Sequence, residues 1–319
     1  HRIDRLVELF HPKKTIYTTF EFTDIAGLVK GASKGEGLGN QFLSNIRLTD
    51  AICHVVRCFD DADITHVEGS VDPIRDIEII NLELIMADLQ TIENRLSKVE
   101  RKAMTNKDKD AIAEVNVLKK LQAALEAGKP VRSLDLEKEE RLLIKAFNLL
   151  TLKPMIYIAN MSDEEIAEPE NNPYYQKVKE LADSEHNQVV PVCAKIEEEL
   201  SGLDKEEKNA FLQELGIPES GLDKVIKTAY QILNLCTFLT AGEDECRAWT
   251  FRKGMLAPQC AGVIHTDFEK GFIRAECYRF EDIDALGSEQ AIKEAGKLRL
   301  EGKEYEVQDG DVLHFRFNV

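Results

Sequence analysis

The sequence predicts an α/β protein with a mostly parallel sheet, an inserted antiparallel helical hairpin and a small C-terminal domain. Several apolar runs end in polar loops, which is typical of buried parallel strands. A long segment between two of these runs places apolar residues at alternating spacings of three and four, as paired helices do. Residues 235–319 then contain short strand-like runs with one helix-like segment, which indicates a separate α+β domain.

The composition is that of a globular protein with more than one domain. The 319 residues exceed the usual size of a single hydrophobic core, and 43% hydrophobic residues are too many for a disordered chain. The formal net charge is −17, and no segment is strongly basic. An extended polybasic surface for nucleic acid is therefore excluded, and any RNA contact would use a local patch such as Lys98, Arg101 and Lys102.

The cysteines and the apolar runs indicate a cytoplasmic protein. The seven cysteines form no C-x-x-C pair, and an odd number favours free thiols over a complete disulfide framework. No apolar run approaches the roughly 20 residues that span a bilayer, so no membrane partner is expected. No charged-then-apolar signal opens the chain, although its first residue is His1 rather than Met.

Four segments have the composition of strands. The first runs from Thr15 to Ile25 and is rich in β-branched and aromatic residues, and the others are the apolar runs 51–59, 155–159 and 189–192. Each run ends in polar or small residues. Because ligands of parallel sheets bind beyond the carboxyl ends of the strands, we expect a functional site where these runs end.

The segment between the second and third runs predicts two helices. A heptad pattern of apolar residues is interrupted by the polar stretch 105–110, resumes, and stops near Gly128-Lys129-Pro130. We interpret residues 76–147 as an inserted antiparallel hairpin; two ordinary amphipathic helices packed on the sheet are the alternative. The apolar positions are Leu82, Ile85, Leu89, Ile92, Leu96, Val99, Ala103, Ala111, Val115, Leu118 and Leu125.

The end of the first strand-like run has the D-x-x-G pattern of a nucleotide switch. Asp24 can hold Mg²⁺ through water, while the amide of Gly27 can reach a γ-phosphate. The segment that follows contains several glycines and is permissive enough to be ordered by the phosphate and released on hydrolysis. The alternative is a flexible linker. These switch glycines are Gly31, Gly35, Gly37 and Gly39.

The ends of the third and fourth runs carry a second nucleotide-binding pattern. Asn160-Met161-Ser162-Asp163 is similar to the base-reading N-K-x-D of GTPases, in which the carboxylate accepts hydrogen bonds that guanine donates and adenine does not. An ordinary Asn and Asp turn is the alternative. Cys193-Ala194-Lys195 matches the short loop that presents backbone donors to the base. Three elements in this order are far more specific than any one of them.

With these motifs in place, the chain resembles the YchF/Obg-like ATPases, a translation-factor-related family of P-loop NTPases. Residues 22–40 look like the switch II of that family, and residues 265–276 and 307–312 look like its TGS module. The resemblance implies a G-domain-like fold and a C-terminal ubiquitin-like β-grasp domain. It also implies slow hydrolysis of a purine nucleotide with Mg²⁺, generally ATP in preference to GTP, and a role in translation or stress regulation.

The resemblance also implies partners and a domain division. The ribosome, as its large subunit or the 70S particle, is the expected partner, with rRNA or tRNA as further candidates. The nucleotide-binding domain would comprise residues 1–75 and 148–220, the hairpin 76–147, a linker helix 221–234 and the TGS domain 235–319.

Several residue roles follow from the resemblance. Leu28 occupies the position where Ras-like proteins carry the glutamine that orients water, so another group must serve. His66 matches a family histidine proposed for this role, with an ordinary surface histidine as the alternative. Asp24 and Gly27 would face Mg²⁺ and the γ-phosphate. The base would lie near Asn160, Met161, Asp163, Cys193 and Ala194.

Two departures from the family pattern leave alternatives open. Asp163 stands where the family commonly has Glu, so ATP and GTP both remain candidate substrates. No G-x-x-x-x-G-K-[ST] motif occurs in the sequence, and we expect an N-terminally truncated chain that alone binds nucleotide poorly. The rival hypothesis is a ribosome- or RNA-associated binding module without nucleotide turnover.

Overall fold

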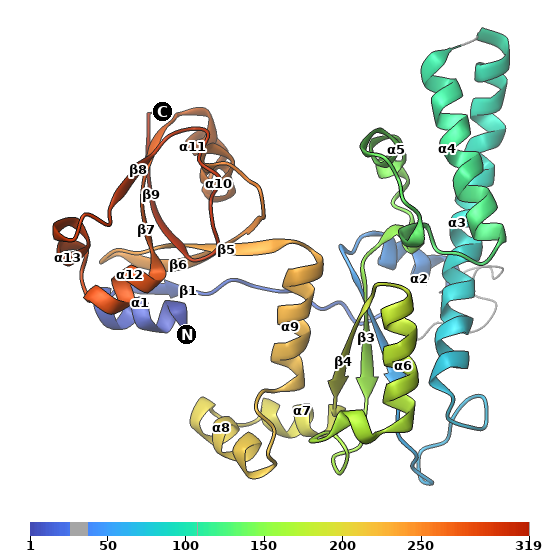
Figure 1. Cartoon of the computed structure of the whole chain (residues 1–319), viewed down its shortest axis with the longest axis horizontal. Coiled ribbons are helices and arrows are strands. Elements are labelled where there is room, and N and C mark those ends of the chain that lie inside the picture. The colour runs from blue at the N-terminus through green and yellow to red at the C-terminus, as the bar shows by residue number, and fades with distance from the viewer. Residues whose placement is uncertain (26–37, 107, 319) are drawn as a thin grey trace. The chain divides into compact units, whose positions relative to one another are not determined.

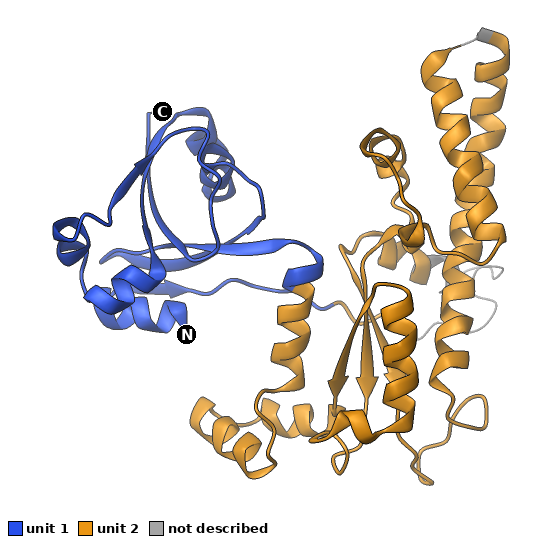
Figure 2. Ribbon diagram, in the orientation of Figure 1, with its two compact units in different colours: residues 1–22, 230–319 blue, residues 23–229 orange. Residues whose placement is uncertain are grey.

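The computed structural model describes residues 1–25, 38–106 and 108–318 and divides the chain into two compact units. Unit 1 contains residues 1–22 and 230–319, and unit 2 contains residues 23–229 (Figure 2). None of the helices in the described ranges is both long and apolar enough to cross a membrane.

Unit 2 is built on a three-stranded parallel sheet. Its strands are β2 (Ile52–Arg57), β3 (Met155–Asn160) and β4 (Gln188–Val192), in the order β2-β3-β4. The first five residues of the central strand, β3, are all buried, as expected for a strand covered on both faces. Strands at the three apolar runs 51–59, 155–159 and 189–192, and their parallel pairing, are confirmed.

Helices cover this sheet and share one hydrophobic core with it. Helix α6 (Pro173–Ser184) lies alongside β3 and β4 (Figure 1). Helix α2 (Leu38–Arg47) buries Leu43 and Ile46 in the same cluster as Tyr157 of β3. The remaining helices of this part of the chain are η5 (Pro169–Asn171), α7 (Ala194–Ser201), α8 (Lys205–Glu214) and α9 (Gly221–Ile232), the last of which ends in unit 1.

The predicted helical hairpin is present. Helix α3 (Pro73–Asn106) and helix α4 (Lys109–Glu126) run antiparallel and extend away from the sheet (Figure 1). Heptad residues such as Ile92 and Leu118 are fully buried between them. Asp108 starts α4 by accepting hydrogen bonds from the backbone N–H groups of Asp110 and Ala111. The chain then returns through η2 (Val131–Ser133), α5 (Lys138–Ile144), η3 (Lys145–Phe147) and η4 (Leu150–Leu152).

A buried carboxylate joins the hairpin to the α/β part of unit 2. Asp88 of α3 is fully buried and accepts hydrogen bonds from the backbone N–H groups of Leu150 and Thr151 and from the Thr151 hydroxyl, at 2.7 to 2.9 Å. Arg47, the last residue of α2, lies 3.5 Å from Asp88 and donates to Thr91 Oγ1 and the Asn148 carbonyl. This junction therefore ties α2, α3 and the segment before β3 together.

Unit 1 contains a mixed six-stranded sheet. Its order is β1-β6-β5-β9-β7-β8, with α10 and α11 packed against one part of it. The C-terminal domain was predicted to begin at residue 235, which is the first residue of β5. The assignment of this domain as a β-grasp fold remains a prediction. The strands are β1 (Lys14–Ile16), β5 (Leu235–Thr240), β6 (Glu245–Arg252), β7 (Phe272–Arg279), β8 (Arg299–Glu301) and β9 (Asp311–Phe317). The helices are α1 (Arg2–Phe10), α10 (Ala257–Ile264), α11 (Thr266–Lys270), α12 (Phe280–Leu286) and α13 (Glu289–Glu294).

The N-terminal segment differs from the prediction. The run from Thr15 to Ile25 was expected to form a strand of the parallel sheet, but only Lys14–Ile16 is a strand, and it pairs with β6 of unit 1. Residues 1–22 thus belong to unit 1, and not to the predicted nucleotide domain 1–75. The reason is packing, because α1 buries Ile3 and Leu6 in a cluster with residues of β5 and α12, and Phe20 packs on Tyr230.

His54 on β2 gives a testable pH dependence of stability. Its Nδ1 is buried without a hydrogen-bond partner, and burial, with Arg132 contributing, lowers the pKa of the imidazole to about 4. Because the pKa of His54 is lower in the folded state, the unfolded state binds the proton more tightly. The free energy of unfolding is therefore highest above the unfolded pKa, about 6.5, and decreases as pH falls toward 4.

We therefore expect His54→Asn to flatten the loss of unfolding free energy between pH 6.5 and 4. The difference between the two pKa values sets an upper limit of about 3 kcal/mol on the contribution of His54. The actual contribution is smaller, because the side chain is only partly buried and solvent screens its charge. Urea denaturation at several pH values measures the difference, with His186→Asn on the surface of unit 2 as control. An equal pH dependence in wild type and His54→Asn would contradict the assignment.

Candidate functional site

The carboxyl ends of the three parallel strands of unit 2 lie level with one another. Arg57 of β2 pairs with Asn160 of β3, and Asn160 pairs with Val192 of β4. The ladder continues one residue further, since the N–H of Cys58 donates to the Asn160 carbonyl at 2.8 Å. The loops that follow these strands therefore start from one edge of the sheet, where ligands of parallel sheets bind.

Asn160 joins two of these loops. Its Oδ1 accepts a hydrogen bond from the backbone N–H of Ala194, at 3.0 Å. The two predicted motifs, Asn160–Asp163 and Cys193–Lys195, are thus brought together by a direct side-chain contact. Such a contact fixes the separation of the two loops at this point.

A second contact between the same loops is ionic. Lys195 Nζ lies 2.6 Å from Asp163 Oδ2, and the hydrogen bond from Lys195 holds the pKa of Asp163 below its usual value. Asp163 is 43% exposed and Lys195 66% exposed, so the pair adds little to stability and can open for a ligand. Asp163 is consequently an ionised acceptor at neutral pH.

Two predicted base-side residues are buried. Met161 is 2% exposed and packs in the hydrophobic core of unit 2, and its backbone N–H donates to the Val192 carbonyl at 2.8 Å. Cys193 is 3% exposed, and burial raises the pKa of its thiol. The side chains of Met161 and Cys193 anchor the two loops in the hydrophobic core. The exposed residues of the candidate site are Asp163, Ala194 and Lys195.

Asn172 is a supporting residue that the sequence motifs did not reveal. It is 2% exposed and its Nδ2 donates to the Cys58 carbonyl and to Glu165 Oε2, both at 3.0 Å. Glu165 also accepts from the Ser162 hydroxyl at 2.9 Å. Asn172 therefore links the end of β2 to the loop after β3. The Asn-Pro dipeptide at 172–173 is a helix-start signal that could have indicated it.

His66 is held in the loop between β2 and α3 by both ring nitrogens. Nε2 lies 2.8 Å from Asp76 Oδ2, and Nδ1 accepts a hydrogen bond from the backbone N–H of Glu68 at 3.0 Å. A ring that accepts at Nδ1 carries its proton on Nε2 and donates it to Asp76. In this arrangement neither nitrogen is available to a water molecule, so a catalytic His66 must first leave Asp76.

The predicted switch residues lie partly outside the described structure. Asp24 is exposed, and the next residue, Ile25, packs against the core of unit 2. Gly39 lies in the first turn of α2. The other predicted switch positions, Gly27, Gly31, Gly35 and Gly37, are outside the described residues.

The described residues do not form a preformed metal-binding site. Within the ranges given above, no three His, Cys, Asp or Glu side chains are grouped so as to hold an ion. A single exposed carboxylate at Asp24 is nevertheless compatible with Mg²⁺, which keeps several waters and takes only one or two protein carboxylates beside substrate phosphates.

Comparison with known proteins identifies the family. A family model described as "50S ribosome-binding GTPase" matches residues 7–87, and the YchF GTPase C-terminal model, described as a protein of unknown function, matches residues 235–318. The "Ribosome-binding ATPase YchF" of Bacillus subtilis is 60% identical over 318 residues, which cover all of this chain and 87% of that protein. The chain belongs to the YchF family.

Further relatives agree with this assignment. The "Ribosome-binding ATPase YchF" of Escherichia coli O157:H7 is 55% identical over 318 residues, which cover all of this chain and 86% of that protein. The solved structure of the Schizosaccharomyces pombe YchF GTPase superposes with a TM-score of 0.88 at 41% identity, covering 99% of this chain and 85% of that one. The predicted family and its α/β, G-domain-like fold class are thus confirmed.

Proposed function

We propose that this protein is a nucleotide-hydrolysing switch that acts on ATP, with GTP as the alternative substrate, and associates with the ribosome. The observation that carries the proposal is the hydrogen bond from the Ala194 N–H to Asn160, which joins the two base-side loops beside the ionised Asp163. This pair of loops occurs in a chain whose relatives are named ribosome-binding ATPases or, in one solved structure, a GTPase.

Asp24 and Mg²⁺ form the proposed phosphate side of the site. The exposed Asp24 carboxylate would hold the ion through water, with Gly27 at the γ-phosphate. Bound Mg²⁺ neutralises charge that develops on the phosphates during transfer. The chain's own contribution is the position of this carboxylate at the start of the glycine-rich segment that leads into α2.

The base side of the site decides the substrate. We assign base contacts to Asn160, Asp163 and the backbone of Ala194, with Met161 and Cys193 supporting the loops from the core. Asp163 can accept hydrogen bonds from guanine once Lys195 moves away, so GTP remains possible on chemical grounds. The name of the relatives favours ATP.

The proposed location is the cytoplasm, with the ribosome as partner. All seven cysteines are free thiols, as a reducing compartment would keep them. Contact with rRNA or tRNA is part of the proposal and would use local basic positions, because the chain is net negative.

The experiment that tests the proposal measures hydrolysis and ribosome binding together. Because the sequence has no G-x-x-x-x-G-K-[ST] motif, we define an extended chain, in which a segment with that motif precedes residue 1. The extended chain is expected to release inorganic phosphate from ATP and to co-sediment with ribosomes in a nucleotide-dependent manner. The rival hypothesis, a binding module without turnover, would be favoured if the extended chain released no phosphate and co-sedimented with ribosomes equally well with and without nucleotide, in a salt-sensitive manner.

His66→Gln tests the proposed water-positioning role. In the extended chain we expect hydrolysis to fall about 100-fold with nucleotide affinity unchanged, since a positioned acid or base contributes about that much. Phosphate release and calorimetric titration give the two quantities. Asp76→Ala serves as comparison, because it removes the acceptor that holds the His66 Nε2–H on α3 and leaves the imidazole in place. A rate that falls equally in both variants, together with a lower melting temperature, would indicate a purely structural histidine.

A further inference from the structure

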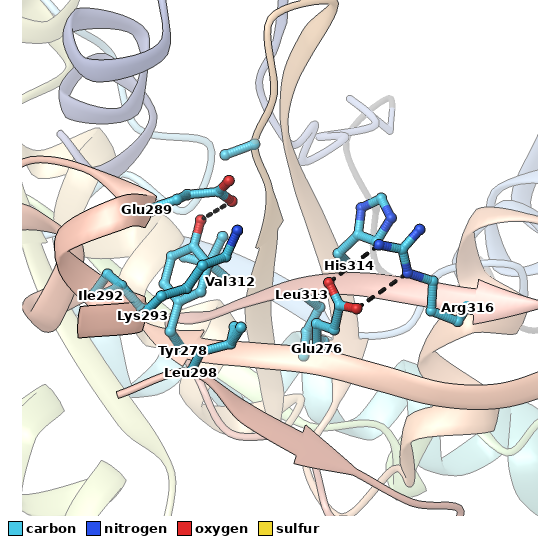
Figure 3. A pocket seen from close by; sticks show the side chains of 11 residues that line it. Glu276, Tyr278, Glu289, Ile292, Lys293, Leu298, Val312, Leu313, His314 and Arg316 are labelled. Atoms are coloured by element: carbon cyan, nitrogen blue, oxygen red, sulfur yellow. Dashed lines mark hydrogen bonds and ion pairs between the residues drawn. The ribbon is translucent and has the colours of Figure 1, made fainter. Parts of the chain in front are cut away.

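Unit 1 contains a pocket on one face of its sheet, remote in sequence from the strand-end loops of unit 2. Its volume is about 280 Å³, close to the lower end of the range of small-molecule sites, roughly 300 to 1,000 Å³. Strands β7 and β9 and helix α13 surround it (Figure 3). Its apolar lining consists of Ala241, Ile292, Leu298, Val312 and Leu313.

Polar side chains gather at two ends of this pocket. At one end the Tyr278 hydroxyl donates to Glu289 Oε1 at 3.0 Å, and Lys293 lies nearby (Figure 3). At the other end Arg316 donates from Nε and Nη2 to the two oxygens of Glu276, at 3.2 and 3.4 Å. An apolar lining with polar groups at its ends is the usual make-up of a small-molecule site.

Cationic groups converge on the Glu276 end. His314 lies opposite Glu276 in the β7–β9 register, and Arg274 lies opposite Arg316. The pKa of Glu276 is lowered, first by the hydrogen bond from Arg316 and then by the charges of Arg316, His314 and Arg274. One carboxylate therefore faces two arginines and a histidine.

This cationic cluster is local. Residues 235–319 contain more acidic than basic side chains, so the positive charge does not come from a generally basic domain. Within the described part of the chain, the side chains of Lys293 and His314 take part in no hydrogen bond or ion pair. Both are exposed and can therefore donate to a ligand.

We propose that this pocket binds a small phosphate monoester with a flat apolar body. The phosphate lies between Arg316 and His314, because a guanidinium matches phosphate oxygens with two parallel hydrogen bonds. The apolar body covers Ala241 and Leu298, the two half-buried apolar residues of the lining, and Lys293 donates to a polar group at its far end. A pocket of this volume fits a small molecule.

Titration of the 319-residue chain with phenyl phosphate and with inorganic phosphate tests the proposal. Phenyl phosphate is expected to bind at least about tenfold more tightly, because only its ring covers the apolar lining. Lys293→Gln should weaken binding about threefold. Glu276→Gln should strengthen it about threefold or more, since it removes the carboxylate that competes for Arg316. A gain in affinity cannot result from a damaged fold.

Two control variants and an RNA probe separate the possible outcomes. Lys303→Gln, an exposed lysine of the same unit outside the pocket, and Asn160→Ala in unit 2 should leave phenyl phosphate binding unchanged. The proposal is overturned if phenyl phosphate does not saturate, or if neither Glu276→Gln nor Lys293→Gln changes its affinity. Binding of hexauridine at least about tenfold more tightly than phenyl phosphate would also overturn it, in favour of an RNA surface.

Discussion

Replacing Asp24 by Asn in the extended chain is expected to lower the rate of nucleotide hydrolysis about 1,000-fold, with a much smaller loss of nucleotide affinity. The reason is that Asp24 is the proposed carboxylate for the water shell of Mg²⁺, and the ion stabilises charge that develops mainly in the transition state. Losing one such preorganised contact typically costs two to three orders of magnitude in rate. Single-turnover phosphate release separates this chemical step from binding.

Glu21→Gln is the matched control for this variant. Glu21 is an exposed acidic residue in the same segment and lies outside the D-x-x-G motif. Its variant should hydrolyse nucleotide at the wild-type rate. An Asp24→Asn protein that stays within about threefold of wild type at saturating Mg²⁺ would remove Asp24 from the proposed machinery.

The Asp88→Ala variant is expected to lose about 4 kcal/mol of unfolding free energy. Asp88 is fully buried and satisfies two backbone N–H groups and the Thr151 hydroxyl, and Arg47 is its nearest charged partner. Alanine leaves these donors and part of the Arg47 charge without an acceptor inside unit 2. Breaking a buried ionic network by removing one partner costs about 3 to 5 kcal/mol.

Urea denaturation followed by circular dichroism measures this loss. Glu93→Ala, an exposed acidic residue on the same helix, is the control and should change stability by less than about 0.5 kcal/mol. A loss at Asp88 no larger than that at Glu93 would mean that the junction between α2, α3 and the segment before β3 does not stabilise the unit.

The hairpin and the parallel strands were predictable because their signals are periodic. Alternating spacings of three and four placed Ile92 and Leu118 in one seam, and both are fully buried. Asp88 was not predictable in the same way. A single acidic residue in an amphipathic helix looks like a solvent-exposed position, and its partners near residue 150 are about 60 positions away in sequence.

The segment 15–25 shows a second limit of sequence reasoning. Its β-branched and aromatic residues predicted a strand, but only Thr15 and Ile16 of this run lie in one. Composition also does not specify which sheet a strand joins. Pairing with β6 depends on contacts to residues more than 200 positions later, such as Glu245 opposite Lys14.

The position of the candidate site was predictable, because it lies at the ends of strands that the sequence indicates. Asn160 and Ala194 were expected at adjacent strand ends and are hydrogen bonded. The burial of Met161 could not be read from its motif, because a residue directly after a buried strand can point either way. The supporting role of Asn172 depends on a tertiary contact with the Cys58 carbonyl, which no local pattern encodes.

The central claim is that the loops joined by Asn160 bind a purine base. Its most direct test is calorimetric titration of Mg²⁺-ATP and Mg²⁺-GTP into the 319-residue chain, the extended chain and the extended chain with Asn160→Ala. We predict saturable one-to-one binding by the extended chain, weakened at least about tenfold by Asn160→Ala, with the ratio of the two affinities giving the base preference. Absence of binding by both chains, or binding that Asn160→Ala leaves unchanged, would contradict the claim.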